Sequence, residues 1–178
     1  MEPWDVDSRA LELLENVCGF APGASPSGLS MLPESAELEV IAGDGSGGCF
    51  YLWHAQRRRE QVPVVYLSSY GEASRFAEDF TAALTIVTAF PGYWCDMLVA
   101  AHKGDEVVAR SLAHYEAGLE PDYAEARKEL CDLLGLNPAV AAARLVAAVR
   151  ATPAFMPPLA SPRGPTPPSS FKDRLAPR

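Results

Sequence analysis

A glycine-rich segment, Gly43–Gly48, leads directly into a run of aromatic and aliphatic residues, Cys49–Trp53. Three of its glycines have the G-x-G-x-x-G spacing of a dinucleotide-binding loop. Such a loop must open a helix, because the helix N-terminus directs free N–H groups at the phosphates. The residues that follow are strand formers instead, and the dipeptide Asp44-Gly45 is a strong turn signal. The segment therefore predicts a β-hairpin with Asp44 as the cap of its turn, and no nucleotide cofactor is expected.

Three short apolar segments predict a small antiparallel sheet. Strands are expected over Glu37–Ala42, Gly48–Ala55 and Val62–Ser68. The polar segment Gln56–Gln61 would connect the second strand to the third. Strands that follow one another over such short connections form an antiparallel meander.

Helical periodicity accounts for most of the remaining sequence. The expected helices cover these ranges: Asp7–Val17, Glu72–Ala89, Tyr93–His102, Asp105–Ala117, Tyr123–Leu134 and Ala139–Ala151. In the second of them, Phe76 and Phe80 begin a core-facing stripe. Asn137 is the expected N-cap of the last helix. The sequence thus predicts an α+β fold: a small twisted antiparallel sheet flanked by helices, with a helical C-terminal extension that caps the sheet.

Composition divides the chain into four parts. Residues 1–18 hold the first helix, and residues 19–28 contain enough Gly, Pro and Ser to be expected as a flexible linker. Residues 29–150 form the α+β domain with its helical cap. Residues 151–178 contain half of the chain's 16 prolines, and they are expected to form a disordered tail.

The net charge of −8 is unevenly distributed over the 178 residues. Four basic residues and one acidic residue give residues 151–178 a charge of +3, so residues 1–150 carry −11. An acidic body repels nucleic acid and attracts basic proteins by long-range steering. We therefore expect a protein partner and no nucleic acid.

The sequence also bears on membranes and metals. No apolar run reaches the roughly 18 residues of a membrane span, and the first residues lack the basic and apolar regions of a secretory signal. A cytoplasmic protein without membrane contact is expected.

The four cysteines, Cys18, Cys49, Cys95 and Cys131, are widely spaced, with no histidine at zinc-ligand spacing. They are expected to be buried apolar residues, with no metal or other cofactor.

Candidate catalytic residues do not combine into a motif. His54, His102 and His114 show no metal-binding or general-base pattern. Cys95 is the best candidate for a reactive thiol, but the adjacent Asp96 opposes formation of a thiolate. We expect a non-enzymatic protein with no catalytic residues.

Several motifs occur in a characteristic order between Leu29 and Phe90. They are the turn Ile41–Gly48, the aromatic strand Phe50–Trp53, the strand Pro63–Leu67 and the helix start Ala73–Phe80. In this order they resemble the SUKH superfamily, the Smi/Knr-like immunity and cell-wall-regulator fold. The resemblance implies an α+β fold and a protein that acts by binding. Many such proteins resemble bacterial immunity factors, which neutralise a toxin, often a basic one, by direct contact.

The sheet and its loops are the expected partner-binding surface. Tyr51, Trp53 and Tyr66 are candidate hot spots on an exposed sheet face, although strand alternation equally allows two of them to lie in the core. The arginines of the predicted hairpin loop are candidate contacts for an acidic partner, or simply a solvated turn. The expected partner-binding residues are Asp44, Ser46, Tyr51, Trp53, Arg57, Arg58, Arg59 and Tyr66.

Two other functions are compatible with the sequence. One is a small-ligand-binding protein or enzyme whose pocket lies between the sheet and the helical cap. A deep apolar cavity with two convergent polar groups would favour it. The other is a scaffold subunit whose proline-rich tail inserts into a neighbouring subunit. The sequence leaves the identity of the partner and the oligomeric state open.

Overall fold

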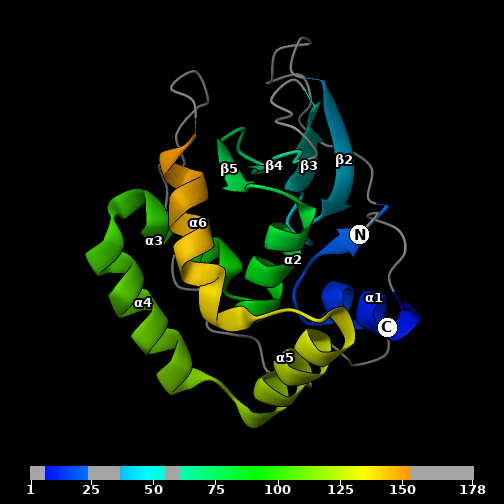
Figure 1. Cartoon of the computed structure of the whole chain (residues 1–178), viewed down its shortest axis with the longest axis vertical. Helices are drawn as coiled ribbons and strands as arrows, with labels where there is room; N and C mark the ends of the chain where they lie inside the picture. The colour runs from blue at the N-terminus through cyan, green and yellow to red at the C-terminus, as the bar shows by residue number, and fades with distance from the viewer. Residues whose placement is uncertain (1–6, 24–36, 55–60, 153–178) are drawn as a thin grey trace.

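The computed structural model describes residues 7–23, 37–54 and 61–152 (Figure 1). At its centre is a five-stranded sheet in which each strand pairs antiparallel with the next. The strands are β1 Ala21–Pro22, β2 Leu38–Gly43, β3 Cys49–Trp53, β4 Val64–Leu67 and β5 Ala73–Ala77. This meander, with helices packed against one of its faces, confirms the predicted α+β fold.

Six α-helices accompany the sheet in the described part of the chain. They are α1 Ser8–Asn16, α2 Phe80–Ala89, α3 Trp94–Lys103, α4 Asp105–Gly118, α5 Pro121–Leu134 and α6 Ala141–Arg150. A short 3₁₀ helix, Pro138–Val140, precedes α6. Helix α6 packs on β5, α2 and α3, whereas α5 packs on α1 and α2. Figure 1 shows α4 and α5 in the lower half of the view, away from the sheet.

Short polar side chains set the starts of two helical segments. The carboxylate of Asp79 accepts a hydrogen bond of 2.8 Å from the backbone N–H of Ala82 at the start of α2. The side-chain oxygen of Asn137 accepts one of 3.0 Å from the N–H of Ala139. Such caps satisfy N–H groups that have no partner inside the helix. The cap at Asn137 was expected from the sequence.

The beginning of the second expected helix is a strand instead. A helix is predicted from Glu72, but residues 73–77 form β5, and α2 begins only at Phe80. The prediction is wrong because Phe76 and Phe80 are four residues apart, a spacing that suits one face of a helix. Pairing with β4 favours the extended conformation here. Both phenylalanines are nevertheless buried, as expected.

The expected linker at residues 19–28 begins with regular structure. Ala21–Pro22 form β1 and pair with β2, and Pro is tolerated there because an edge strand has one row of N–H groups without ladder partners. Phe20 is buried, with its ring centroid 5.0 Å from that of Phe50. The prediction of an irregular connector is therefore wrong for this part, and residues 24–28 lie outside the described ranges.

Both faces of the sheet are apolar. One face shares a core with the helices, and this main core includes Phe50, Tyr66 and Phe76 together with Trp94 of α3. The opposite face carries a separate cluster of strand residues, which we call the second sheet face. Its members are Cys49, Tyr51, Trp53, Val65, Leu67 and Ala73, with Leu38 and Val40 packed against them.

Among the helices described, none is by itself long and apolar enough to cross a membrane. Two pairs reach that length and composition together, but they are bent by 105° between α2 and α3 and by 103° between α5 and the segment Pro138–Arg150. The expected tail is described only at Ala151 and Thr152, and its other residues lie outside the described ranges.

Candidate functional site

The carboxylate of Asp44 organises the turn between β2 and β3. Its Oδ1 accepts hydrogen bonds from the backbone N–H groups of Ser46 at 2.9 Å and Gly48 at 2.7 Å. Its Oδ2 accepts a bond of 2.6 Å from the hydroxyl of Tyr66 on β4. Asp44 is only 9% exposed, so these donors replace the water that a buried carboxylate would otherwise need. The structure confirms the predicted hairpin and its Asp44 cap.

The turn closes tightly around this carboxylate. Burial raises the pKa of Asp44, but the hydrogen bonds from Tyr66, Ser46 and Gly48 outweigh burial and hold the pKa below its ordinary value. Gly48 has no room for a side chain, because an added Cβ would lie 2.5 Å from the Tyr66 hydroxyl oxygen. The N–H groups of Ser46 and Gly48 thus bind an internal anion, the Asp44 carboxylate.

The three expected aromatic hot spots are buried. Tyr66 lies in the main core, with its ring centroid 5.0 Å from that of Trp94. Tyr51 and Trp53 lie in the second sheet face. The prediction of an exposed aromatic face is wrong because β3 and β4 are buried on both sides. Alternation along these strands therefore sends every aromatic side chain into one apolar cluster or the other.

The other expected binding residues do not form a binding surface around the three aromatic residues. Ser46 is exposed, and its hydroxyl lies 2.7 Å from each carboxylate oxygen of Asp44. Arg57, Arg58 and Arg59 lie outside the described residues. Within the described ranges, then, the sheet loops do not bring the expected residues together as a binding site.

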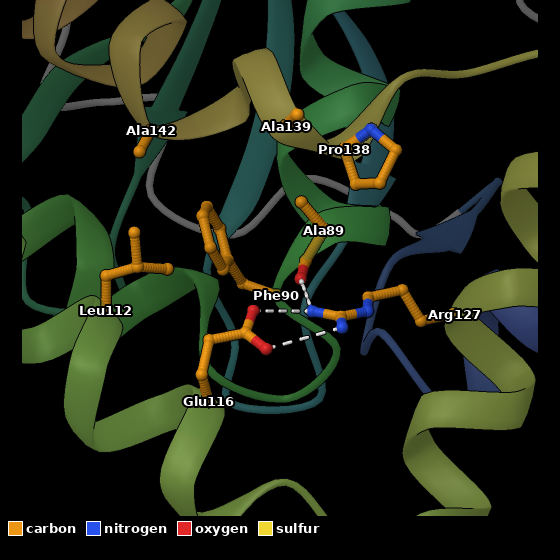
Figure 2. A pocket seen from close by; sticks show the side chains of 8 residues that line it. All are labelled: Ala89, Phe90, Leu112, Glu116, Arg127, Pro138, Ala139 and Ala142. Carbon is orange, nitrogen blue, oxygen red and sulfur yellow. Dashed lines mark hydrogen bonds and ion pairs between the residues drawn. The ribbon is translucent and has the colours of Figure 1, made fainter.

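Two pockets lie instead where α4 and α5 approach the end of α2. We call the first the ion-pair pocket; it has a volume of about 260 Å³. Its lining residues are Ala89, Phe90, Leu112, Glu116, Arg127, Pro138, Ala139 and Ala142. Figure 2 shows Glu116 and Arg127 side by side, with Pro138, Ala139 and Ala142 on the opposite side of the pocket. One charged pair thus faces an otherwise apolar lining.

Arg127 is held in place by three hydrogen bonds (Figure 2). Its guanidinium donates to both carboxylate oxygens of Glu116, at 2.8 and 3.4 Å, and to the carbonyl oxygen of Ala89 at 3.5 Å. Ala89 is the last residue of α2, where carbonyl groups lack partners inside the helix. The hydrogen bond to Glu116 raises the pKa of Arg127. The pair is bidentate, which fixes both side chains more firmly than a single contact would.

The second pocket, which we call the tyrosine pocket, has a volume of about 250 Å³. Its lining residues are Pro91, Tyr93, His114, Tyr115, Gly118, Leu119, Glu120 and Tyr123. The rings of Tyr93 and Tyr115 are stacked, with centroids 5.2 Å apart and planes 16° from parallel. Glu120 and His114 are exposed and supply polar groups. The pocket is therefore aromatic inside and polar at its margin.

Tyr115 links the two pockets. Its ring is 6.0 Å from the guanidinium carbon of Arg127, the charged residue of the ion-pair pocket. Tyr115 is 8% exposed, and within the described residues its hydroxyl has no hydrogen-bond partner. Burial raises the pKa of Tyr115. A buried hydroxyl without a partner is costly, and it marks a place where an added acceptor would stabilise the protein.

The sequence does not reveal this site. Glu116 and Arg127 lie on different helices, and the sequence pattern places them on two amphipathic segments without showing that these approach each other. The one visible signal is the concentration of Tyr93, Tyr115 and Tyr123 near the breaks between helices. The alternative function expects a pocket between sheet and cap, and neither the ion-pair pocket nor the tyrosine pocket is in that place, since both lie among the helices.

A serine–histidine contact that the sequence did not reveal occurs elsewhere. His102 Nε2 lies 2.8 Å from the Oγ atom of Ser74 on β5. Ser74 is fully buried, so a substrate carbonyl does not reach its hydroxyl. Burial lowers the pKa of His102. The contact is better explained as a polar link between α3 and the sheet than as a nucleophile with its base.

Metal binding and known relatives give no further assignment. In residues 7–23, 37–54 and 61–152, no group of three or more His, Cys, Asp and Glu side chains is placed to hold a metal ion. No protein-family model matches this sequence, and no curated protein or solved structure is significantly similar to the chain.

Proposed function

We propose that this protein is a non-enzymatic binding module that docks a basic segment of a partner protein into the paired pockets between α4 and α5. The observation that carries the proposal is the pair itself: two largely apolar pockets of about 260 and 250 Å³ that meet at the contact between Tyr115 and Arg127. The carboxylate of Glu116 lines the ion-pair pocket, and the carboxylate of Glu120 lines the tyrosine pocket.

The size of the pockets favours side chains of a protein over a free small molecule. Pockets for drug-sized ligands have volumes of about 300–1,000 Å³, and each of these is smaller. Protein interfaces, by contrast, gain most of their binding energy from a few large side chains inserted into apolar pockets. Two adjacent pockets therefore suit two anchor residues on one partner segment.

Charge favours a basic partner. Residues 1–150 carry −11, which follows from −8 for the whole chain and +3 for residues 151–178. Asp122 and Glu125 on α5 add acidic side chains close in sequence to the pocket residues Glu120 and Tyr123. Such a field accelerates association with a positively charged protein and penalises acidic competitors.

The resemblance to the SUKH superfamily names the biological role that we propose. Immunity proteins of that type act by contact with a toxin, and a basic toxin would suit the acidic body of this chain. The antiparallel sheet flanked by helices is the architecture that the resemblance implies. The binding surface proposed here lies mostly on the helical extension, and of the residues that line the two pockets only Ala89 and Phe90 belong to the segment Leu29 to Phe90 that carries the resemblance.

Co-expression with a toxin tests the proposed function. The full chain is produced together with a basic toxin encoded beside it, and growth and complex formation on size exclusion are measured. We expect rescue of growth and a stable complex. Absence of both would contradict the proposed function.

Leu112→Glu tests the site, because it introduces a charge into the ion-pair pocket. We expect the affinity for the toxin to fall at least about tenfold. The matched control is Leu133→Glu on α5, since Leu133 is 45% exposed and lines neither pocket. Equal affinity of both variants in a complex that still forms would contradict the site while leaving the function intact.

A further inference from the structure

A short chain of polar side chains joins α3 and the end of α6 to the last strand of the sheet. Its members are His102 on α3, Ser74 on β5 and Thr152, which follows α6. Ser74 is fully buried and lies two residues before Phe76 of the main core, so its side chain points toward the helices. Helix α6 packs on both β5 and α3 (Figure 1). The chain of polar groups therefore connects three elements that already lie together.

The distances give the hydrogen bonds of this chain a direction. The backbone N–H of Arg75 donates to Thr152 Oγ1 at 3.1 Å. Thr152 Oγ1 lies 3.4 Å from Ser74 Oγ, which lies 2.8 Å from His102 Nε2. Because Thr152 Oγ1 accepts from the backbone, its own proton points to Ser74, and the Ser74 proton then points to His102. The carbonyl oxygen of Arg75 is a more distant acceptor for Ser74, at 3.3 Å.

This direction requires a neutral imidazole at His102. A neutral ring accepts a hydrogen bond at one nitrogen and carries its proton on the other, whereas a charged ring donates at both. A proton on Nε2 therefore reverses the chain. The Ser74 hydroxyl must then turn to Thr152 Oγ1, and the Thr152 hydroxyl loses its acceptor in the chain. Such a loss is costly for groups that are withdrawn from water.

The surroundings of His102 do not compensate for a positive charge. Burial lowers the pKa of His102 below its ordinary value. Helix α2, which also packs on α3, holds no charged residue. The charged residues of α3, α4, α6 and β5 nearest to this end of α3 are Lys103, Asp105, Glu106, Arg150 and Arg75. Asp105 and Arg150 pair with each other at 2.8 Å, and Glu106 is exposed. The other two are themselves positive.

We propose that His102, Ser74 and Thr152 form a pH-sensitive latch, which holds α3 and the end of α6 on β5 while His102 is neutral and loosens when its ring is protonated. The stability that the latch contributes is fully present above the pKa of an unfolded histidine. It is lost as the pH falls from that value through the lower pKa of the folded protein. The latch is separate from the pockets between α4 and α5 and does not depend on the proposed function.

Hydrogen exchange at the backbone N–H of Arg75 reports on the latch, because this group donates to Thr152. The native full-length chain is compared at about pH 7.5 and about pH 5, a range in which ordinary carboxylates stay ionised. Each rate is divided by the intrinsic rate at that pH. We expect the protection of Arg75 to fall about fivefold or more at the lower pH. The N–H of Ser68, which bonds the Glu72 carbonyl in the β4–β5 turn, is the internal control and should keep its protection. Unchanged protection of Arg75 would overturn the proposal.

His102→Gln is the matched variant. Glutamine offers a hydrogen-bond acceptor to Ser74 but takes up no proton in this pH range, and His54 and His114 remain in the chain. The protection of Arg75 should therefore be the same at both pH values. A fall as large as in the native protein would assign the pH dependence to another group and rule out the latch.

The position of the proton on the His102 ring decides the case in which the variant does not fold. Proton–nitrogen NMR correlations of the native chain distinguish a ring nitrogen that carries a proton from one that accepts a hydrogen bond. At about pH 7.5 we expect Nδ1 to carry the proton and Nε2 to accept from Ser74. A proton on Nε2 at this pH would contradict the direction of the chain and with it the proposal.

Discussion

The hairpin turn and the pockets between α4 and α5 each contain a buried tyrosine hydroxyl and a carboxylate, but only in the hairpin does the hydroxyl donate to the carboxylate. In the hairpin, the hydroxyl of Tyr66 donates to the carboxylate of Asp44 at 2.6 Å, and both groups are buried. In the pockets, the hydroxyl of Tyr115 is buried without a partner among the described residues, while Glu116 pairs with Arg127 near the surface. The hairpin is satisfied internally, whereas the pockets leave apolar volume and a donor for another molecule.

The largest expected effect comes from removing the carboxylate of the hairpin. Asp44→Ala leaves two backbone N–H groups and the Tyr66 hydroxyl without their acceptor. We expect the free energy of unfolding to fall by about 3 kcal/mol, as measured by urea denaturation. Asp79→Ala is the control, since this residue caps α2 through one hydrogen bond and its loss should cost about 1 kcal/mol. Equal losses would show that the turn is no more demanding than a helix cap.

Acid weakens the same turn. The pKa of Asp44 is lower in the folded protein than its ordinary value, so its contribution to stability is fully present above the unfolded pKa. That contribution is lost as the pH falls through the folded pKa. The stability lost between pH 7 and pH 3 should therefore be smaller in Asp44→Asn than in the native protein, by urea denaturation at both pH values. An identical loss in the two proteins would contradict the depressed pKa.

One substitution made in both regions tests the comparison directly. Tyr66→Phe removes a donor that Asp44 needs, and we expect a loss of about 2 kcal/mol. Tyr115→Phe removes a buried hydroxyl that has no partner in the described structure, and we expect a gain of up to about 1 kcal/mol. Thermal and urea unfolding of the two variants measure the difference. Destabilisation by Tyr115→Phe would mean that its hydroxyl is already bonded.

The difference between the regions also explains what the sequence can predict. The Asp44 turn is local: a turn dipeptide, glycines and the first strand residues lie within a few positions, so its conformation follows from neighbouring residues. The strand β5 is not local, because its conformation depends on pairing with β4. Phe76 and Phe80 are four residues apart, and both can be buried either on one face of a helix or on the two sides of a strand-to-helix junction. The local sequence pattern alone therefore predicts the helix.

The candidate site depends on tertiary arrangement even more than β5 does. Leu112, Glu116 and Arg127 line one pocket only because α4 and α5 approach the end of α2. No motif specifies the angle between two amphipathic helices, which is set by the shapes of the side chains packed between them. Likewise, the aromatic residues of β3 and β4 look like interface residues until both sheet faces are known to be buried.

The smallest expected effect concerns the ion pair of the pockets. The side chains of Arg127 and Glu116 are 22% and 47% exposed, so water screens their attraction. A double-mutant cycle with Glu116→Gln and Arg127→Gln should give a coupling energy of about 0.5 kcal/mol, reduced in 1 M salt. Arg127→Gln alone should cost more than Glu116→Gln, because it also removes the contacts with Ala89 and Tyr115. A coupling above about 2 kcal/mol would place this pair in the same class as Asp44 and Tyr66, and the pockets would then be as internally satisfied as the hairpin.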